Sequence, residues 1–459
     1  MYSGRRIGWV MVLVLLLLMV GATVACAEGP DMNGAATLKA NPAAAVNFAW
    51  TLLCGFLVFF MQAGFAFVEA GFCRAKNTVN ILTKNFMDFC IGGLAYWAFG
   101  FAVMFGGSKL APGLEAGNSW FGFSGFFLTG NAYDVTTNMF WMFQMMFAAA
   151  SATIVSGAMA ERTKITAYMA YSFLISAIIY PIFGKWVWGG GWLATLPFGA
   201  GARDFAGSGV VHAVGGLVAL AGARMVGPRR GKFNQDGTAN AIPGHNMAFV
   251  ILGTLILFFG WFGFNPGSTL AATDLRISVI AVNTFLAGVA GAVTAMYVTL
   301  VRTGKADLGM ACNGSLVGLV GVTASCAYVA PWAAVIIGAV AAVLMMLSLT
   351  FVEKVLRVDD PVGAVSVHGA GGLWGLLAVG IFADGSYGGV AGLIAGNAGQ
   401  IVAQLITMLV VIVWAFGTGL LLFSLLKRTM GLRASVKEET RGLDITEHGV
   451  ECYPAETAL

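Results

Sequence analysis

Two of the four histidines, His212 and His368, stand within long apolar stretches of this 459-residue chain. A neutral imidazole offers one hydrogen-bond donor and one acceptor, so such a pair could hold a small polar molecule or relay a proton. A single buried histidine is more often a core residue bonded to a nearby carbonyl. Ionisable groups inside membrane-length segments, however, are candidates for a functional site. The other two histidines, His245 and His448, fall in polar segments.

Both histidines occupy the same position of an internal repeat. The segment D-F-A-G-S-G-V-V-H-A-V-G-G-L begins at Asp204, and D-P-V-G-A-V-S-V-H-G-A-G-G-L begins at Asp360, 156 residues later. Half of the paired positions are identical, the histidine and the following Gly-Gly-Leu among them. Matching repeat positions favour two histidines that line a common pore over two unrelated core residues.

The composition is that of a membrane protein. Apolar residues make up 58% of the chain and charged residues 10%, against about 25% charged in a soluble domain. The net charge of +4 is too small and too dispersed to indicate nucleic-acid binding. Seven cysteines without a C-x-x-C pair give neither a disulfide framework nor a metal signature. We therefore predict an all-α membrane protein that is not an enzyme and has no cofactor.

Beyond residue 45, eleven apolar stretches approach the roughly 20 residues that a bilayer demands. One repeat copy opens the fifth stretch and the other opens the tenth, so the unit is five helices and the second copy is inverted. We predict eleven transmembrane helices, with helices 1–5 and 6–10 as an inverted repeat plus an eleventh helix. Such repeats place a substrate path at their interface near the membrane midplane. The expected spans are 47–72, 86–106, 138–160, 165–183, 205–223, 247–266, 276–300, 309–328, 332–352, 363–383 and 399–426.

Positive charge divides unequally between alternate loops. The predicted inner loops and tail hold eighteen Lys and Arg residues, whereas the outer loops hold only Lys109, Lys185, Arg203 and Arg276. Cytoplasmic loops retain such charges. The amino terminus is therefore expected outside the cytoplasmic membrane and the tail, 427–459, inside.

The amino-terminal residues 1–27 have the pattern of a secretory signal. Arg5 and Arg6 precede an apolar core, and Ala25-Cys26-Ala27 offers small residues for cleavage. We predict cleavage, which leaves residues 28–426 as the transmembrane domain. Two alternatives stay open: a lipid on Cys26, or an uncleaved segment that forms a twelfth helix.

Four motifs together resemble the ammonium transporter (Amt/MEP/Rh) family, on its Amt side. They are D-F-A-G-S-G-V-V-H, G-W-F-G-F-N-P-G-S from Gly260, V-D-D-P-V-G-A-V-S-V-H-G from Val358 and G-L-D-I-T-E-H-G from Gly442. The resemblance covers nearly the whole chain after the signal. It implies ammonium or ammonia transport by a homotrimer with one pore per subunit.

The resemblance also implies residue roles. Phe147, Trp188 and Ser268 match an outer ammonium site, where an aromatic cage holds the cation and a serine accepts an N–H, and Asp204 matches a buried aspartate beside it. Phe147 and Phe264 match a stacked pair that closes the pore, Trp261 lines the same wall, and His212 and His368 line the lumen. Each residue also has a structural interpretation: interfacial aromatics, a helix-end turn at Ser268 and a helix cap at Asp204.

In the family picture, ammonium loses its proton near the gate and ammonia crosses the apolar lumen, with or without a following proton. Of neutral conduction and net charge transport, we favour electrogenic uptake. Methylammonium is a further candidate substrate.

Four positions depart from the family pattern or need separate interpretation. Gln62 and Glu69 are seven residues apart, hence on one helical face; Glu69 could pair with a basic loop residue or act at the inner pore mouth. Gly363 stands where some relatives are acidic, so we expect Asp360 to be a loop cap.

The tail, 427–459, resembles a regulatory tail that couples subunits to one another and to PII-type signalling proteins; a disordered tail is the alternative. Three rival functions remain: an ammonium sensor that acts through a partner, a redox protein with haem on the two histidines, and an Rh-type channel for carbon dioxide or methylamine.

Overall fold

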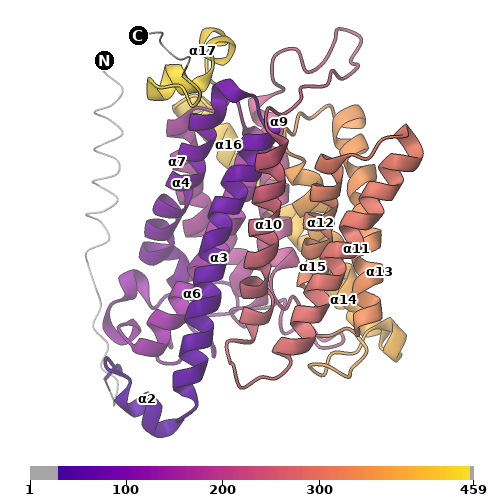
Figure 1. Cartoon of the computed structure of the whole chain (residues 1–459). Coiled ribbons are helices and arrows are strands. Elements are labelled where there is room, and N and C mark those ends of the chain that lie inside the picture. Colours follow the sequence, from indigo (N-terminus) through magenta and orange to yellow (C-terminus); the bar gives the residue numbers. More distant parts are fainter. Residues whose placement is uncertain (1–28, 455–459) are drawn as a thin grey trace.

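The structure, a computed structural model, describes residues 29–454. The predicted signal segment and Cys26 lie outside the described residues. Nearly all regular structure in the described part is helical (Figure 1). In chain order the helices of six or more residues and the turns that matter below are α2 Ala35–Ala40, α3 Ala44–Phe72, α4 Thr78–Ala95, α6 Val135–Met159, α7 Ile165–Leu174, α8 Tyr180–Val187, η6 Ser208–Ala213, α9 Val214–Val226, α10 Met247–Phe264, η7 Pro266–Thr269, α11 Ile277–Thr303, α12 Leu308–Thr323, α13 Pro331–Thr350, η9 Val365–Ala370, α14 Gly371–Phe382, α15 Ala398–Val411, α16 Gly417–Thr429, α17 Val436–Arg441 and η12 Asp444–His448.

Within residues 29–454, ten helical segments are long and apolar enough to cross a bilayer. An eleventh apolar helix, α12, has 16 residues, or about 24 Å at 1.5 Å per residue. It packs between α11, α13 and α14 like its longer neighbours. The multi-pass all-α prediction is therefore confirmed. The spans themselves are often composite, as where α4 continues through five further residues, Tyr96–Gly100, into Phe101–Phe105.

The described amino-terminal residues and the tail lie at opposite ends of the helix bundle. Figure 1 shows α2 at the bottom and α17 at the top. An odd number of crossings is needed for this arrangement, as the count of eleven gives.

The inverted repeat is visible where the two histidine segments begin. Gly207 has φ +115° and Gly363 has φ +82°, a left-handed conformation that glycine adopts at little cost. After Gly207, the Asp204 carboxylate accepts hydrogen bonds from the backbone N–H groups of Gly207, Gly209 and Val210 at 2.8–2.9 Å. Asp360 accepts from the equivalent Gly363 and from Val365 at 3.0 and 2.7 Å. Asp204 and Asp360 therefore cap matching helices, as expected for Asp360.

The two repeat halves cross at their glycines. A Cβ added to Gly216 would overlap the backbone nitrogen of Gly369, and one added to Gly372 would overlap the carbonyl oxygen of Ser208. Gly216 and Gly372 are matching repeat positions. Small residues allow helix backbones to approach closely in membranes. The Gly-Gly pairs therefore bring the two histidine helices together.

Candidate functional site

The two histidines meet at the repeat interface. His212 of η6 and His368 of η9 are both buried, their ring centroids are 5.2 Å apart, and their Nδ1 atoms are 3.1 Å apart. His212 Nε2 is buried and has no hydrogen-bond partner among the described residues. A buried polar atom without a partner is costly. This nitrogen is therefore positioned for a ligand that can hydrogen-bond.

The His212 segment is wound more loosely than an α-helix. The His212 N–H donates to the Gly207 carbonyl five residues earlier, at 3.1 Å. Such π-helical turns often mark functional sites. The matching segment around His368 is wound in the same way.

A stack of aromatic rings continues from His212 along α10. Trp261 and Phe264 stack on its imidazole at centroid distances of 5.2 and 5.4 Å. Trp261 is fixed by a hydrogen bond of 2.9 Å from its Nε1 to Thr323 Oγ1. Phe264 in turn lies 4.1 Å from Phe147 of α6, centroid to centroid. All three aromatic rings are buried. The structure thus brings together the predicted gate and the histidine pair.

The predicted outer-site residues lie beyond this stack. Trp188 packs edge-on against Phe147 at 6.0 Å, and its Nε1 donates to the Asp204 carbonyl at 2.6 Å. Ser268 lies one turn beyond Phe264 and donates its hydroxyl to the Phe264 carbonyl at 2.8 Å. Because that proton is used, the Ser268 oxygen is left as an acceptor. Trp188 and Ser268 are only partly buried, unlike Phe147.

Gln62 and Glu69 share one face of α3, as predicted, and both contact α6. Thr153 Oγ1 lies 2.8 Å from Gln62 Oε1 and 2.7 Å from the Asp88 carboxylate. Ser156 donates to Glu69 at 2.7 Å. The interpretation in which Glu69 pairs with a basic loop residue is wrong: none of the ion pairs among the described residues includes it. Its partners are neutral side chains.

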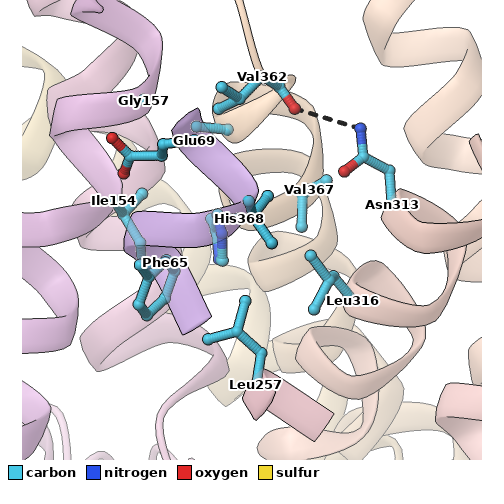
Figure 2. A pocket seen from close by; sticks show the side chains of 12 residues that line it. Phe65, Glu69, Ile154, Gly157, Leu257, Asn313, Leu316, Val362, Val367 and His368 are labelled. Atoms are coloured by element: carbon cyan, nitrogen blue, oxygen red, sulfur yellow. Dashed lines mark hydrogen bonds between the residues drawn. The ribbon is translucent and has the colours of Figure 1, made fainter. Parts of the chain in front are cut away.

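A cavity of about 30 Å³ is lined by both Glu69 and His368. That volume exceeds the roughly 10–15 Å³ that a water molecule needs. Figure 2 shows Glu69 beside Ile154 and Gly157 of α6, with His368 in the middle of the lining. Most other lining residues are apolar. The sequence alone does not predict this shared cavity, although the seven-residue spacing places Glu69 on the correct helix face.

A buried ionic cluster at the tail-side end was also missed. Arg229 contacts Glu161 at 2.6 Å and Asp359 at 2.9 Å, and Arg74 contacts Glu161 at 2.5 Å. Burial acts to raise the pKa of Asp359, but hydrogen bonds from Arg229 and the charges of Arg162 and Arg229 outweigh it and lower that pKa to about 2. The cluster ties together segments far apart in the chain, which no local pattern could reveal.

Comparison with known proteins shows the family of this chain. Residues 49–453 match the Ammonium Transporter Family. The chain belongs to this family. It is 53% identical to ammonium transporter Amt2 of Archaeoglobus fulgidus, over 98% of this chain and 96% of that protein. Family membership identifies the chain as a membrane transporter of ammonium and not an enzyme.

Solved structures of the ammonium transporter family have the same fold. A protein described as a sensor Amt protein superposes with a TM-score of 0.81 at 38% identity, covering 89% of this chain and 100% of that one. Mep2 of Candida albicans superposes with a TM-score of 0.77 at 29% identity, covering 85% and 87%. The haem hypothesis finds no support in the geometry, because the 3.1 Å contact between imidazoles leaves no room for a macrocycle between them.

Proposed function

We propose that ammonium is held at an outer site formed by Phe147, Trp188 and Ser268, loses its proton at the Phe147–Phe264 gate, and crosses as ammonia along His212 and His368. The observation that carries this route is the unpartnered, buried Nε2 of His212 behind the aromatic stack. Ammonia has both N–H donors and a lone pair, so it can supply the missing partner.

The outer site suits a cation by its chemistry. A desolvated cation over an aromatic face gains about 2 kcal/mol, against about 0.5–1 kcal/mol when exposed. Trp188 and Phe147 meet edge to face, and the Ser268 oxygen is free to accept an N–H. Asp204 adds negative charge behind Trp188 and also orients that ring through its carbonyl.

The gate explains selection for ammonium. The rings of Phe147 and Phe264 lie 4.1 Å apart and leave no polar partner for a bare ion. A charged group in hydrocarbon is costly unless its charge is met. Ammonium can give up a proton and pass as a neutral molecule, whereas potassium cannot.

We propose that transport is electrogenic, with the proton following through the histidines. Their Nδ1 atoms are within hydrogen-bond distance, so a proton can move from one imidazole to the other. Methylammonium, which also carries N–H donors, is a further proposed substrate.

For topology, we propose an outside amino terminus, cleavage of residues 1–27, a transmembrane domain of 28–426 and a cytoplasmic tail of 427–459. The division of positive charge between loops supports this orientation. The tail is folded in its described part, which disfavours the disordered alternative: η12 Asp444–His448 follows α17 directly.

We further propose a homotrimer whose tail regulates transport and binds a PII-type protein. Contacts of the tail with the first inner loop support a regulatory role. Lys76 donates to the carbonyls of Glu439 and Thr440 at 2.8 Å, and the backbone N–H of Asn80 donates to Asp444 at 2.8 Å. A conformational change of the tail would therefore alter the contacts at the start of α4. Native mass spectrometry, with and without a PII-type protein, tests both the assembly and the partner.

Transport by the purified protein in liposomes tests the proposed route. Current and internal pH are recorded after jumps of ammonium, methylammonium and potassium. The proposal expects current with the first two and none with potassium. Absence of ammonium flux through an intact, correctly oriented protein would favour the sensor function instead.

A further inference from the structure

Glu69 lies buried beside the proposed pore and has no cationic partner within residues 29–454. Its side chain comes from α3 and is 2% exposed. Both hydrogen bonds to the carboxylate fall on one oxygen, Oε2, which accepts from Ser156 at 2.7 Å and Asn85 at 3.1 Å. None of the described residues donates to Oε1. One carboxylate oxygen is therefore fixed and the other is available.

The nearest ionisable side chains on α4 are engaged elsewhere. The Lys84 ammonium donates to the Thr163 carbonyl at 2.6 Å. Asp88 contacts the Thr153 hydroxyl at 2.7 Å. Neither forms an ion pair with Glu69. A purely structural carboxylate at this depth would be expected to have a cationic partner, because burial of an unpaired charge is costly.

Glu69 lines the same cavity as His368. This cavity has room for about one small molecule, water or ammonia. Gly157 keeps the Glu69 side of it open. A Cβ at this position would overlap Val362 and would lie 3.6 Å from the Glu69 carboxyl carbon. Gly157 and Glu69 lie on the same side of the lining (Figure 2).

We propose that Glu69 is the inner proton carrier of the pore, the group that returns the proton to ammonia before release. The protonated carboxyl transfers its proton to ammonia in the cavity, giving carboxylate and ammonium. After the ammonium has left, the carboxylate is reprotonated from His368 through a water molecule that enters the cavity, and His368 receives its proton from His212. One ammonium thus forms for each proton that crosses. This inference rests on the histidine route proposed above.

The test is Glu69→Gln in proteoliposomes, with ammonium current and ammonia-driven change of internal pH measured on the same sample. Glutamine keeps the size and the polar contacts but cannot carry the proton. General acid–base groups typically contribute 10²–10⁴-fold, so we expect the current to fall about a hundredfold or more while neutral ammonia flux persists. Glu69→Asp should recover part of the current.

Glu353→Gln is the matched control, because Glu353 pairs with Lys232 at the tail-side surface outside this cavity. It should retain its current. Normal current in Glu69→Gln would overturn the proposal, as would equal loss of current and ammonia flux in a well-folded variant, which would show a structural role. Failure of the histidine route itself is recognised separately, as transport that survives replacement of both histidines.

Discussion

His212 and His368 face each other with their Nδ1 atoms 3.1 Å apart, so a single proton must serve both nitrogens. When His212 Nδ1 donates, its Nε2 is an acceptor and His368 Nε2 is a donor. When a proton is added at His212 Nε2, the shared proton can move to His368 Nδ1 while the proton on His368 Nε2 leaves, and the two outer nitrogens then exchange their donor and acceptor roles. The two histidines therefore act as one unit. A proton added to one imidazole changes whether the outer nitrogen of the other imidazole is a hydrogen-bond donor or an acceptor.

The double variant His212→Leu/His368→Leu tests this unit. Leucine keeps apolar volume but removes the donor and acceptor pairs, so we expect an assembled trimer with almost no ammonium current. Oligomeric state and melting temperature in detergent are measured first, and currents in liposomes second. His→Asp should instead admit water and let potassium pass. A folded double Leu trimer with near-normal ammonium current would refute the histidine route.

Ser268→Ala and Trp188→Leu test the outer site. Each removes a contact to the cation while leaving the buried stack of Phe147 and Phe264 in place. Loss of a hydrogen bond to a charged group is worth about 1.5–3 kcal/mol. The half-saturating ammonium concentration should therefore rise about tenfold or more, as measured by current against concentration. Unaltered concentration dependence in both variants would place the site elsewhere.

Gly216→Ala tests the helix crossing. The added methyl would overlap the backbone of Gly369, so the helices must move apart. We expect a loss of about 1–3 kcal/mol, seen as a lower melting temperature, together with reduced ammonium current. Gly417→Ala is the control, because nothing lies within 4 Å of its added methyl, and it should stabilise α16 slightly. Equal melting temperatures and equal ammonium currents in the two variants would contradict this close helix crossing.

Asp359 should make stability depend on pH in the acid range. Its pKa is lowered to about 2 in the folded chain, so its stabilising effect is complete above about pH 4 and is lost as pH falls toward 2. We expect Asp359→Asn to lower stability at pH 6 by about 3 kcal/mol and to flatten the acid dependence of the melting temperature. The control is Asp384→Asn, in an exposed turn, which should change neither the stability at pH 6 nor the acid dependence of the melting temperature. An unaltered acid dependence in Asp359→Asn would contradict the stabilising role of Asp359.

Cys452 offers a native probe of orientation. It is partly exposed near the end of the tail and forms no disulfide with another described cysteine. An impermeant maleimide should label it in intact cells only after permeabilisation, and Cys452→Ser should remove that signal. Labelling from outside intact cells would reverse the proposed topology.

The fold was largely predictable because its signals are local. Apolar length predicts membrane helices, and the repeated Asp, Gly and His around His212 and His368 predict both the inversion and the meeting of the two halves. The composite nature of the spans was not predictable. Turns of different winding inside a span, such as Tyr96–Gly100, are set by packing rather than by hydropathy.

The candidate site was predictable to the extent that it resembles a known pattern. The positions of Phe147, Phe264 and His212 in one stack follow the family motifs. Glu69 shows the limit of such reasoning. Its spacing from Gln62 predicts the helix face. Whether the Glu69 carboxyl lies beside a cation or beside a cavity depends on residues of α6 and η9, which are distant in the sequence. The same holds for Glu161, whose partners are distant in sequence.

The capping carboxylates of Asp204 and Asp360 also affect the energy of the passing ion. The amino terminus of a helix carries roughly half a positive charge, which would repel ammonium at both ends of the path. At each of these helix ends a carboxylate accepts hydrogen bonds from the backbone N–H groups, and its negative charge offsets the partial positive charge of the helix terminus. Because the two halves are inverted copies, entry and exit share this offset of the helix charge. We therefore expect the pore to be reversible, with the direction of net flow set by the ammonium gradient and the membrane potential.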